Sequence, residues 1–216
     1  MNEQEILDFL SHAETGALTD AMNLLHLDGW MEGIYPLPPD IRICGKAFTV
    51  QYERNPGPGS TVLNVFEIME LAEKGSVMVC SVPSKDAIVG ENIMHATQAC
   101  SLAGMVLDGV ARDSGVIRRD QLPLFCRSFG IRLETACKIT AVQQPVCCGG
   151  VRVRPGDYIV GDCDGVIAIR PEDAEAIIYQ ARRVSEVEAE LERTIQSGQG
   201  MKAVSAVSAK KKKPFA

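Results

Sequence analysis

Hydrophobic and polar residues follow each other along the chain with a spacing that changes from helical to extended and back. Near the amino-terminal end, EQEILDFLSHA places apolar residues at helical spacing, and TDAMNLLHL indicates a second short helix capped by Thr19 or Asp20. Prolines then interrupt the helical pattern, and the alternation from Ile41 to Tyr52 predicts a strand. Both helices are expected to cover the core.

The middle of the chain predicts a βαβ unit. Residues 61–73 have helical spacing that stops at Gly75, after which the apolar run SVMVCSV indicates a buried strand. ENIMHATQACSLA is helical, and MVLDG is a second buried strand. In such a unit, the carboxyl ends of parallel strands and the amino termini of helices meet at one edge, where ligands gather. We therefore expect residues 89–92 (VGEN) and 108–113 (DGVARD) to lie along one rim.

The rest of the chain predicts a β meander and a long helix. LPLFCR, ITAVQQPV and GGVRVRPGDYIVGDCDGVIAI are strand-rich, and the helical pattern returns from Pro171 to a stop near Gly198. The sequence thus predicts one α/β domain over residues 1–200, with a central βαβ unit, a β meander and flanking helices. Residues 201–216 lack folding signals and are expected to form a flexible basic tail.

Charge and cysteine content narrow the classes of function. The net charge of −6 over 216 residues argues against nucleic-acid binding, and Lys210 to Lys213 is the only basic run. No stretch has the roughly 18 apolar residues that span a membrane, and no signal peptide is evident, so we expect a cytoplasmic protein without a membrane partner. Eight cysteines without a CxxC pair suit reduced, buried thiols better than disulfides or a zinc site.

The candidate chemistry lies at the exit of the second buried strand, where Asp108, Arg112 and Asp113 fall within six positions. An ion pair or a solvated strand end is the ordinary interpretation of this pattern. A carboxylate at a strand exit can also hold a divalent cation, while the free amides of a facing helix terminus, residues 91–93, receive a substrate carboxylate. Arg112 adds a planar donor fork for a second oxygen. Such a site suits an oxygen-rich anion, for example a 2-oxo acid.

The spacing of these residues is similar to a known signature. Residues 92–111 separate Glu91 from Arg112 and Asp113 by 20 positions. This resembles the acid-x20-Arg-Asp signature of the 4-hydroxy-4-methyl-2-oxoglutarate / 4-carboxy-4-hydroxy-2-oxoadipate aldolase family, which also includes the regulator of ribonuclease activity A. The resemblance runs from GALTDAM through GKAFTV, VGEN, DGVARD and GGVRVRPGDYIVGDCDGV to the helix ending near Gly198. It implies a swivelling β/β/α fold.

The resemblance also implies roles for the residues of the rim. Asp113 resembles the direct ligand of a divalent metal, Mg²⁺ or Mn²⁺, and Glu91 resembles the acid that acts through metal-bound water. Arg112 resembles the arginine that contacts the pyruvyl group and stabilises its enolate. Gly90 and the amides of Glu91, Asn92 and Ile93 resemble the cradle for the pyruvyl carboxylate.

The resemblance implies one further site residue, in the carboxy-terminal helix. Glu188 resembles the glutamate that a neighbouring subunit of a homotrimer or homohexamer lends to the site, and Glu186 or Glu190 takes that place if the helix register differs. Two departures bear on activity. Position 91 holds Glu where the aldolases commonly have Asp, and Val116 stands where some members have an acid.

The function implied by the resemblance is retro-aldol cleavage of a 4-hydroxy-2-oxo acid to pyruvate and a second carbonyl compound, by a class II, metal-dependent aldolase with oxaloacetate decarboxylase side activity. Lys85 and Lys138 have no context that suggests a Schiff base. The alternative is a non-catalytic regulator that binds a ribonuclease or helicase. An acid at position 91, which the regulators are expected to lack, favours the enzyme. Methyl transfer is a weaker alternative because no glycine-rich strand-to-helix loop for a nucleotide-like cofactor is present.

Overall fold

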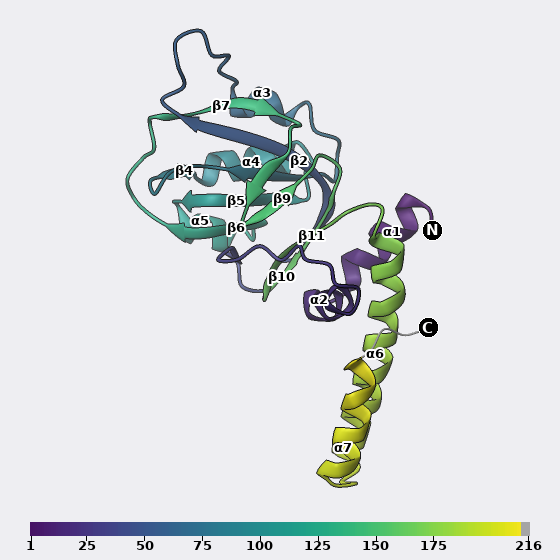
Figure 1. Cartoon of the computed structure of the whole chain (residues 1–216). Helices are drawn as coiled ribbons and strands as arrows, with labels where there is room; N and C mark the ends of the chain where they lie inside the picture. Colours follow the sequence, from purple (N-terminus) through teal and green to yellow (C-terminus); the bar gives the residue numbers. More distant parts are fainter. Residues whose placement is uncertain (213–216) are drawn as a thin grey trace. The chain divides into compact units, whose positions relative to one another are not determined.

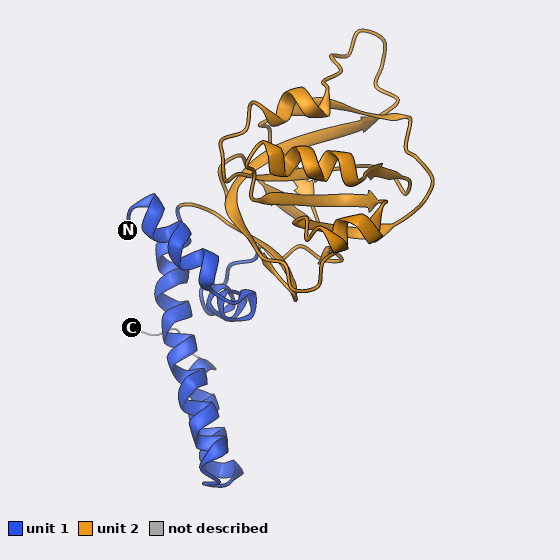
Figure 2. Cartoon of the chain, turned by 180° about the vertical axis from the view of Figure 1, so that it is seen from behind, with its two compact units in different colours: residues 1–28, 172–216 blue, residues 29–171 orange. Residues whose placement is uncertain are grey.

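The computed structural model describes residues 1–212, and it divides the chain into two compact units where the sequence predicts one domain. One unit combines residues 1–28 with the segment from residue 172 onward, and the other comprises residues 29–171 (Figure 2). The first unit is helical because its sequence repeats apolar residues at helical spacing. The second unit holds every strand of the described chain (Figure 1).

The second unit is built on a mixed sheet with the order β1-β6-β5-β3-β2-β10-β11, in which β4 also pairs with β5 and β7 with β2. β3 runs parallel to both β2 and β5, and β5 runs parallel to β6. β8 and β9 form a separate hairpin. The strands are β1 (Tyr35–Pro36), β2 (Ile43–Arg54), β3 (Val77–Ser81), β4 (Ala87–Val89), β5 (Gly104–Ala111), β6 (Leu124–Phe129), β7 (Cys137–Val142), β8 (Val146–Cys148), β9 (Val151–Val153), β10 (Tyr158–Asp162) and β11 (Gly165–Ile169).

Both faces of the central strands are buried, as their continuous apolar sequences require. Along β3, Met78 and Cys80 belong to one hydrophobic cluster, whereas Val77 and Val79 belong to the other. The helices α3 (Val65–Met69), α4 (Glu91–Ala99) and α5 (Ser114–Arg119) contribute to the first cluster, and the β8–β9 hairpin contributes to the second. The βαβ unit formed by β3, α4 and β5 and the mixed α/β fold are confirmed.

Two predicted helix boundaries are wrong. α2 spans Thr15–Leu24, so it begins before Thr19, and its N-cap residue Glu14 makes no side-chain cap bond. α3 covers only part of the predicted 61–73 segment. It begins where Asn64 caps the amide of Phe66, and it ends in a tight turn in which Leu71 donates to the carbonyl of Ile68.

The helical unit consists of α1 (Glu3–His12), α2, α6 (Ala174–Gln196), α7 (Met201–Ser208) and the short 3₁₀ helix η1 (Ala209–Lys212). A capping box between Asn2 and Glu5 starts α1, and the apolar stripe of α6 is buried. Where the sequence predicts a flexible tail from residue 201, the structure has α7 and η1, held by ion pairs of Lys210 and Lys211 with acids of α2 and α6. The remainder of the predicted tail, from position 213, lies outside the described residues.

Of the eight cysteines, four are buried as the sequence predicts, namely Cys80, Cys126, Cys137 and Cys148, whereas Cys147 and Cys163 are exposed. Burial raises the pKa of Cys80 to about 12 and that of Cys126 to about 11, so these thiols stay protonated and serve as small apolar side chains. No helix within residues 1–212 is long and apolar enough to cross a membrane.

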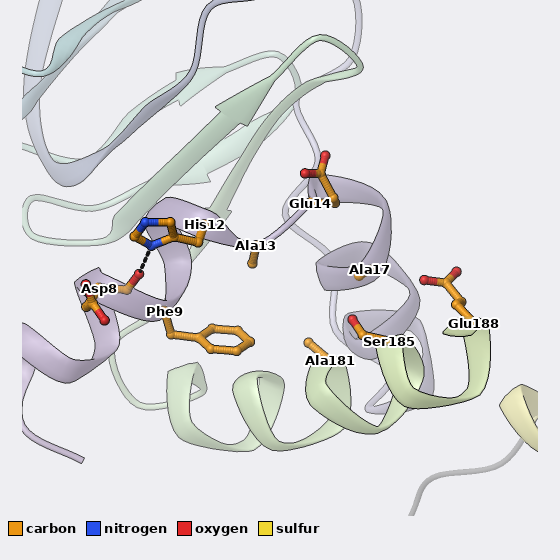
Figure 3. A pocket seen from close by; sticks show the side chains of 9 residues that line it. All are labelled: Asp8, Phe9, His12, Ala13, Glu14, Ala17, Ala181, Ser185 and Glu188. Carbon is orange, nitrogen blue, oxygen red and sulfur yellow. Dashed lines mark hydrogen bonds between the residues drawn. The ribbon is translucent and has the colours of Figure 1, made fainter. Parts of the chain in front are cut away.

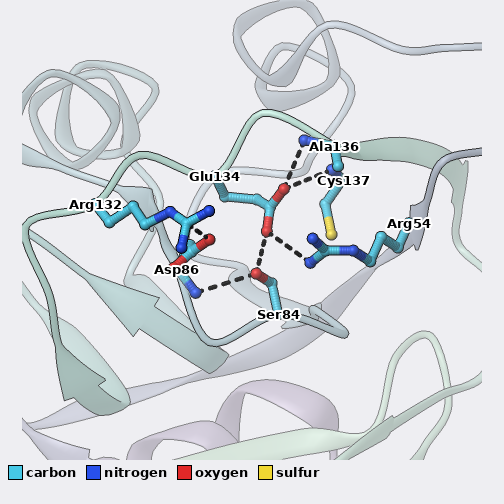
Figure 4. Close-up of polar contacts among 7 residues, drawn as sticks. All are labelled: Arg54, Ser84, Asp86, Arg132, Glu134, Ala136 and Cys137. Carbon is cyan, nitrogen blue, oxygen red and sulfur yellow. Dashed lines mark hydrogen bonds and ion pairs between the residues drawn. The ribbon is translucent and has the colours of Figure 1, made fainter.

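A buried carboxylate joins three segments of the sheet unit (Figure 4). Glu134 accepts hydrogen bonds from the hydroxyl of Ser84, from the amides of Ala136 (2.6 Å) and Cys137 (3.1 Å), and from Arg54 Nη1 (3.3 Å). Because these donors favour the ionised form, with Ser84 contributing most, the pKa of Glu134 falls to about 2.

The lowered pKa predicts how stability depends on pH. The ionised form of Glu134 stabilises the fold above pH 4.5, its ordinary pKa, and this stabilisation is lost as pH falls through 4.5 toward about 2. We expect Glu134→Gln to lower the free energy of unfolding at pH 7 by about 2 kcal/mol, because it removes charge-assisted hydrogen bonds. In urea titrations the difference from the wild type should shrink at acid pH. Glu53→Gln, an exposed change of the same kind on β2, should be neutral, and an equally neutral Glu134→Gln would contradict the assignment.

Candidate active site

Two strand-to-helix junctions meet at one edge of the sheet. β4 leads through Gly90 into α4, and β5 leads through Arg112 and Asp113 into α5. β4 pairs with β5 in parallel, and the amide of Arg112 donates to the carbonyl of Val89 at 2.8 Å. The predicted rim, with VGEN and DGVARD side by side, is therefore confirmed.

Asp113 is the residue on which the two junctions converge. It is the N-cap of α5 with φ 58° and ψ 31°, a left-handed conformation that Asp tolerates better than most residues, and its side chain makes no cap bond. Its Oδ2 atom instead accepts the amide of Glu91 at 3.2 Å and lies 3.6 Å from Arg112 Nε. The side chains of Arg112 and Asp113 are 43% and 36% exposed, so both are accessible to a ligand.

Gly90 makes the close approach of the two junctions possible. Its backbone is extended, with φ −139°, so any residue could adopt the conformation. A Cβ atom added at this position would lie 2.4 Å from Asp113 Oδ2 and 3.3 Å from Arg112 Nε. A side chain at position 90 would therefore displace the Asp113 carboxylate, so glycine is favoured here by the carboxylate next to it and not by the backbone angle.

We expect Gly90→Ala to lower catalytic efficiency at this site by at least about tenfold, because the new methyl group displaces the Asp113 carboxylate. The melting temperature should change little, since the side chain of Asp113 is partly exposed and can move. Gly115→Ala, in α5 two residues after Asp113, meets nothing within 4 Å and should keep activity. Full activity of Gly90→Ala would show that the position of this carboxylate is unimportant.

The predicted carboxylate cradle, the amides of residues 91–93, lies at the amino terminus of α4. The amide of Glu91 is used by Asp113, and the amide of Met94 closes the first helical turn on the carbonyl of Gly90 at 3.2 Å. The amides of Asn92 and Ile93 lie between them in the first turn, where no intrahelical acceptor exists. These two amides can receive a ligand oxygen next to Arg112.

A cationic group beside the site was not predicted from the sequence. Asp120 accepts hydrogen bonds from Arg119 at 2.6 and 3.0 Å, and His95 Nε2 lies 3.4 Å from the same carboxylate. The hydrogen bond from Arg119 lowers the pKa of Asp120, and this bond, with a smaller contribution from the Glu91 carboxylate, raises the pKa of Arg119. His95, which is exposed on α4, therefore has a structural partner.

Asp108 belongs to the same sequence cluster but not to the site. Its carboxylate forms a bidentate ion pair with Arg127, with Nη2 at 3.1 Å from Oδ2, and accepts the amide of Gly149 at 2.7 Å. Arg127 also donates to the carbonyl of Glu32. Asp108 thus anchors neighbouring segments, and the interpretation of this acid as an ion-pair partner holds. Asp113, in contrast, faces the rim.

The acids of α6 have partners within the helical unit. Glu188 pairs with Lys211 at 2.8 Å, and Lys211 also pairs with Asp20 at 2.7 Å. Glu190 pairs with Lys210 at 2.6 Å, and Glu186 pairs with Arg183. The structure thus describes Glu188 in one unit and Asp113 in the other, and a role for Glu188 at the site stays a prediction.

The Asp113 carboxylate offers oxygen ligands to a hard cation that keeps most of its water. Carboxylate oxygens are the ligands that Mg²⁺ and Mn²⁺ prefer, and Mg²⁺ is commonly bound through one or two carboxylates plus substrate oxygens. In residues 1–211, three ligand side chains come within reach of one ion only at Asp162, Cys163 and Asp164 in the β10–β11 turn. Asp113 could therefore hold an ion only together with water and substrate, which matches this mode of binding.

The chain is similar to known proteins in both sequence and structure. A model of the RraA-like family, described as Aldolase/RraA, matches residues 15–168. A Halalkalibacterium halodurans protein, provisionally named a 4-hydroxy-4-methyl-2-oxoglutarate aldolase, is 32% identical over 186 residues, which is 85% of this chain and 86% of that protein. An uncharacterized Pseudomonas syringae pv. tomato protein of known structure has a TM-score of 0.82 and 31% identity, covering 93% of this chain and 96% of its own.

A more distant structure shares the fold alone. Streptomyces coelicolor RraAS2, described as an unusual member of the RNase ES inhibitor RraA protein family, has a TM-score of 0.78 at 22% identity, covering 89% of this chain and 97% of its own. The family model spans both junctions of the rim, and the resemblance noted in the sequence is confirmed. This chain belongs to the RraA-like family of Aldolase/RraA proteins.

Proposed function

We propose that the protein is a class II pyruvate aldolase, which cleaves a 4-hydroxy-2-oxo acid into pyruvate and a second carbonyl compound with the help of Mg²⁺ or Mn²⁺. The main support is the convergence of the Asp113 carboxylate, the Arg112 side chain and the amino terminus of α4 within a few ångströms. The aldolase name of the relative with 32% identity agrees with this reaction class.

Each group has a task in this reaction. A divalent ion held by Asp113 would supply Lewis acidity toward the 2-oxo and carboxylate oxygens of the substrate. The amides of Asn92 and Ile93 receive the carboxylate, and Arg112 stabilises the negative charge that develops on the enolate oxygen. Glu91 begins α4 beside Asp113, where it can order a water that takes the proton of the substrate hydroxyl. The same enolate chemistry permits decarboxylation of oxaloacetate.

The proposal includes a homotrimer or homohexamer in which Glu188 of a neighbouring copy completes the site. Position 188 lies on an exposed part of α6, as a residue that reaches another chain must. The substrate beyond its pyruvyl half would be contacted by loops such as residues 53–60.

The direct test is pyruvate release from a panel of 4-hydroxy-2-oxo diacids and oxaloacetate. We expect turnover with Mg²⁺ or Mn²⁺ and its complete loss after exhaustive chelation, restored by adding the metal back. Turnover that survives chelation would eliminate the metal-dependent mechanism. No turnover with any substrate or metal, together with binding to a ribonuclease or helicase, would instead support the regulator.

A further inference from the structure

The last described helices fold back along α6. The chain turns after α6 at Gly198 and Gly200, whose φ values of 69° and 86° are ones that glycine adopts without strain. α7 then runs beside α6 (Figure 1). Its half-buried side chains, at helical spacing on one face, are Ala203, Val204 and Val207. This packing brings η1 next to the middle of α6.

Two lysines of η1 pair with the acids that this packing brings within reach. Lys211 Nζ lies 2.8 Å from Glu188 Oε1 and 2.7 Å from Asp20 Oδ2, so it joins α6 to α2. Lys210 Nζ lies 2.6 and 2.7 Å from the two carboxylate oxygens of Glu190. Although partial burial disfavours its charge, the hydrogen bonds to Asp20 and Glu188 raise the pKa of Lys211. We call the contact of Lys211 with Glu188 and Asp20 the lysine clamp.

Glu188 also borders an acidic groove of about 480 Å³ among α1, α2 and α6 (Figure 3). Two further carboxylates line this groove, those of Asp8 and Glu14. None of the nine lining residues, all within the described part of the chain, is a lysine or an arginine. Carboxylates that share a groove repel one another. The positive charge that Glu188 contacts thus comes from Lys211, outside the lining.

We propose that the lysine clamp is an autoinhibitory contact, in which Lys211 competes with the active site for the Glu188 carboxylate. The inference rests on the proposed function, in which Glu188 acts in a site outside its own helical unit. A carboxylate that orders a catalytic water must have its oxygens free, whereas Glu188 Oε1 already accepts a hydrogen bond from Lys211. When the clamp opens, Glu188 is left charged beside the two other groove acids, and their repulsion favours its release to the site.

The exposure of the lysine clamp indicates a contact that opens readily. The side chain of Lys211 is 24% exposed, and that of Glu188 is 47% exposed. Ion pairs of such exposure contribute little to stability, and salt screens them. The clamped state is therefore only severalfold more populated than the open state, and its share falls as the ionic strength rises. The expected effect is a graded inhibition and not an on-off switch.

Removal of the Lys211 charge tests the autoinhibition through the rate of pyruvate release. We expect Lys211→Gln to raise kcat by about threefold to fivefold at low ionic strength, with little change in KM, and the difference from the wild type to shrink at high salt. Lys211→Arg, which can bond both acids, should keep the wild-type rate. So should Lys202→Gln, an exposed change of the same kind on α7. A rate of Lys211→Gln equal to or below that of the wild type would overturn the proposal.

Hydrogen exchange of the full chain tests the lysine clamp without turnover. The amides of α7 should exchange severalfold faster in Lys211→Gln than in the wild type, because the ion pairs that hold this segment are lost, and Lys202→Gln should exchange as the wild type does. Unchanged exchange in Lys211→Gln would show that the contact does not hold the segment, and the proposal would be wrong. Faster exchange without pyruvate release from any variant would instead refute the aldolase proposal, and the autoinhibitory role with it, while the clamp itself would stand.

Discussion

Asp113→Asn is expected to lower the rate of pyruvate release by on the order of a thousandfold while leaving the fold intact. Asparagine keeps the shape of the side chain, tolerates the left-handed backbone at φ 58°, and offers an amide oxygen to the amide of Glu91. It loses the negative charge that a hard divalent ion requires. The measurement combines initial rates with thermal unfolding and with Mn²⁺ binding by electron paramagnetic resonance.

The matched control for this variant is Asp40→Asn. Asp40 is an exposed aspartate in the segment between β1 and β2, so the change in side chain is the same while the rim stays untouched. Its activity and its Mn²⁺ binding should equal those of the wild type. If Asp113→Asn unfolds at a markedly lower temperature, the carboxylate serves the fold, and the metal assignment is wrong. Retained Mn²⁺ binding with lost activity would likewise separate Asp113 from the ion.

The sequence predicted the βαβ unit because its physical signals are local. β3 and β5 are continuous apolar runs, and α4 between them has a regular helical pattern and ends before the turn that leads to Gly104. The topology of such a unit then places the start of α4 near the end of β5. The position of Glu91 beside Asp113 follows from these rules alone.

The local sequence pattern does not distinguish Asp108 from Asp113, and only the family resemblance singles out Asp113. Both acids follow the same apolar run, but Asp108 is still within β5, and its partner Arg127 lies on β6. Their pairing depends on the register of two strands, which shifts after Leu107. No local pattern encodes this register. The steric role of Gly90 could not be predicted for the same reason, because it depends on the Asp113 carboxylate lying against Gly90 in the folded protein.

The carboxy-terminal helices illustrate a second limit. Residues 201–212 have weak periodicity, and an isolated helix of this length is marginal in water. In the structure, Lys211 joins Asp20 of α2 to Glu188 of α6, which is a tertiary contact between residues far apart in the sequence. Composition indicates a solvated tail here, and only the folded unit shows which acids these lysines face.

Arg112→Lys is expected to lower the rate by on the order of a hundredfold, although the charge is conserved. The backbone of Arg112 is fixed by its hydrogen bond to Val89, and its Nε faces Asp113 at 3.6 Å. The two terminal nitrogens then form a planar fork for substrate oxygens, whereas an ammonium group offers a single point of charge. Because the enolate carries more charge on oxygen than the ground state, the loss should fall mainly on kcat and less on KM.

The control for Arg112→Lys is Arg152→Lys, an exposed change of the same kind on β9 in the same unit, which should keep normal kinetics. Steady-state rates for pyruvate release, measured for both variants with saturating Mg²⁺, separate kcat from KM. A loss confined to KM would mean that Arg112 binds the substrate equally in the ground state and the transition state. Turnover of Arg112→Lys close to that of the wild type would reduce Arg112 to an ion-pair partner of Asp113, and the enolate would then need another stabilising group. Arg119, whose raised pKa reflects in part the Glu91 carboxylate, is a candidate.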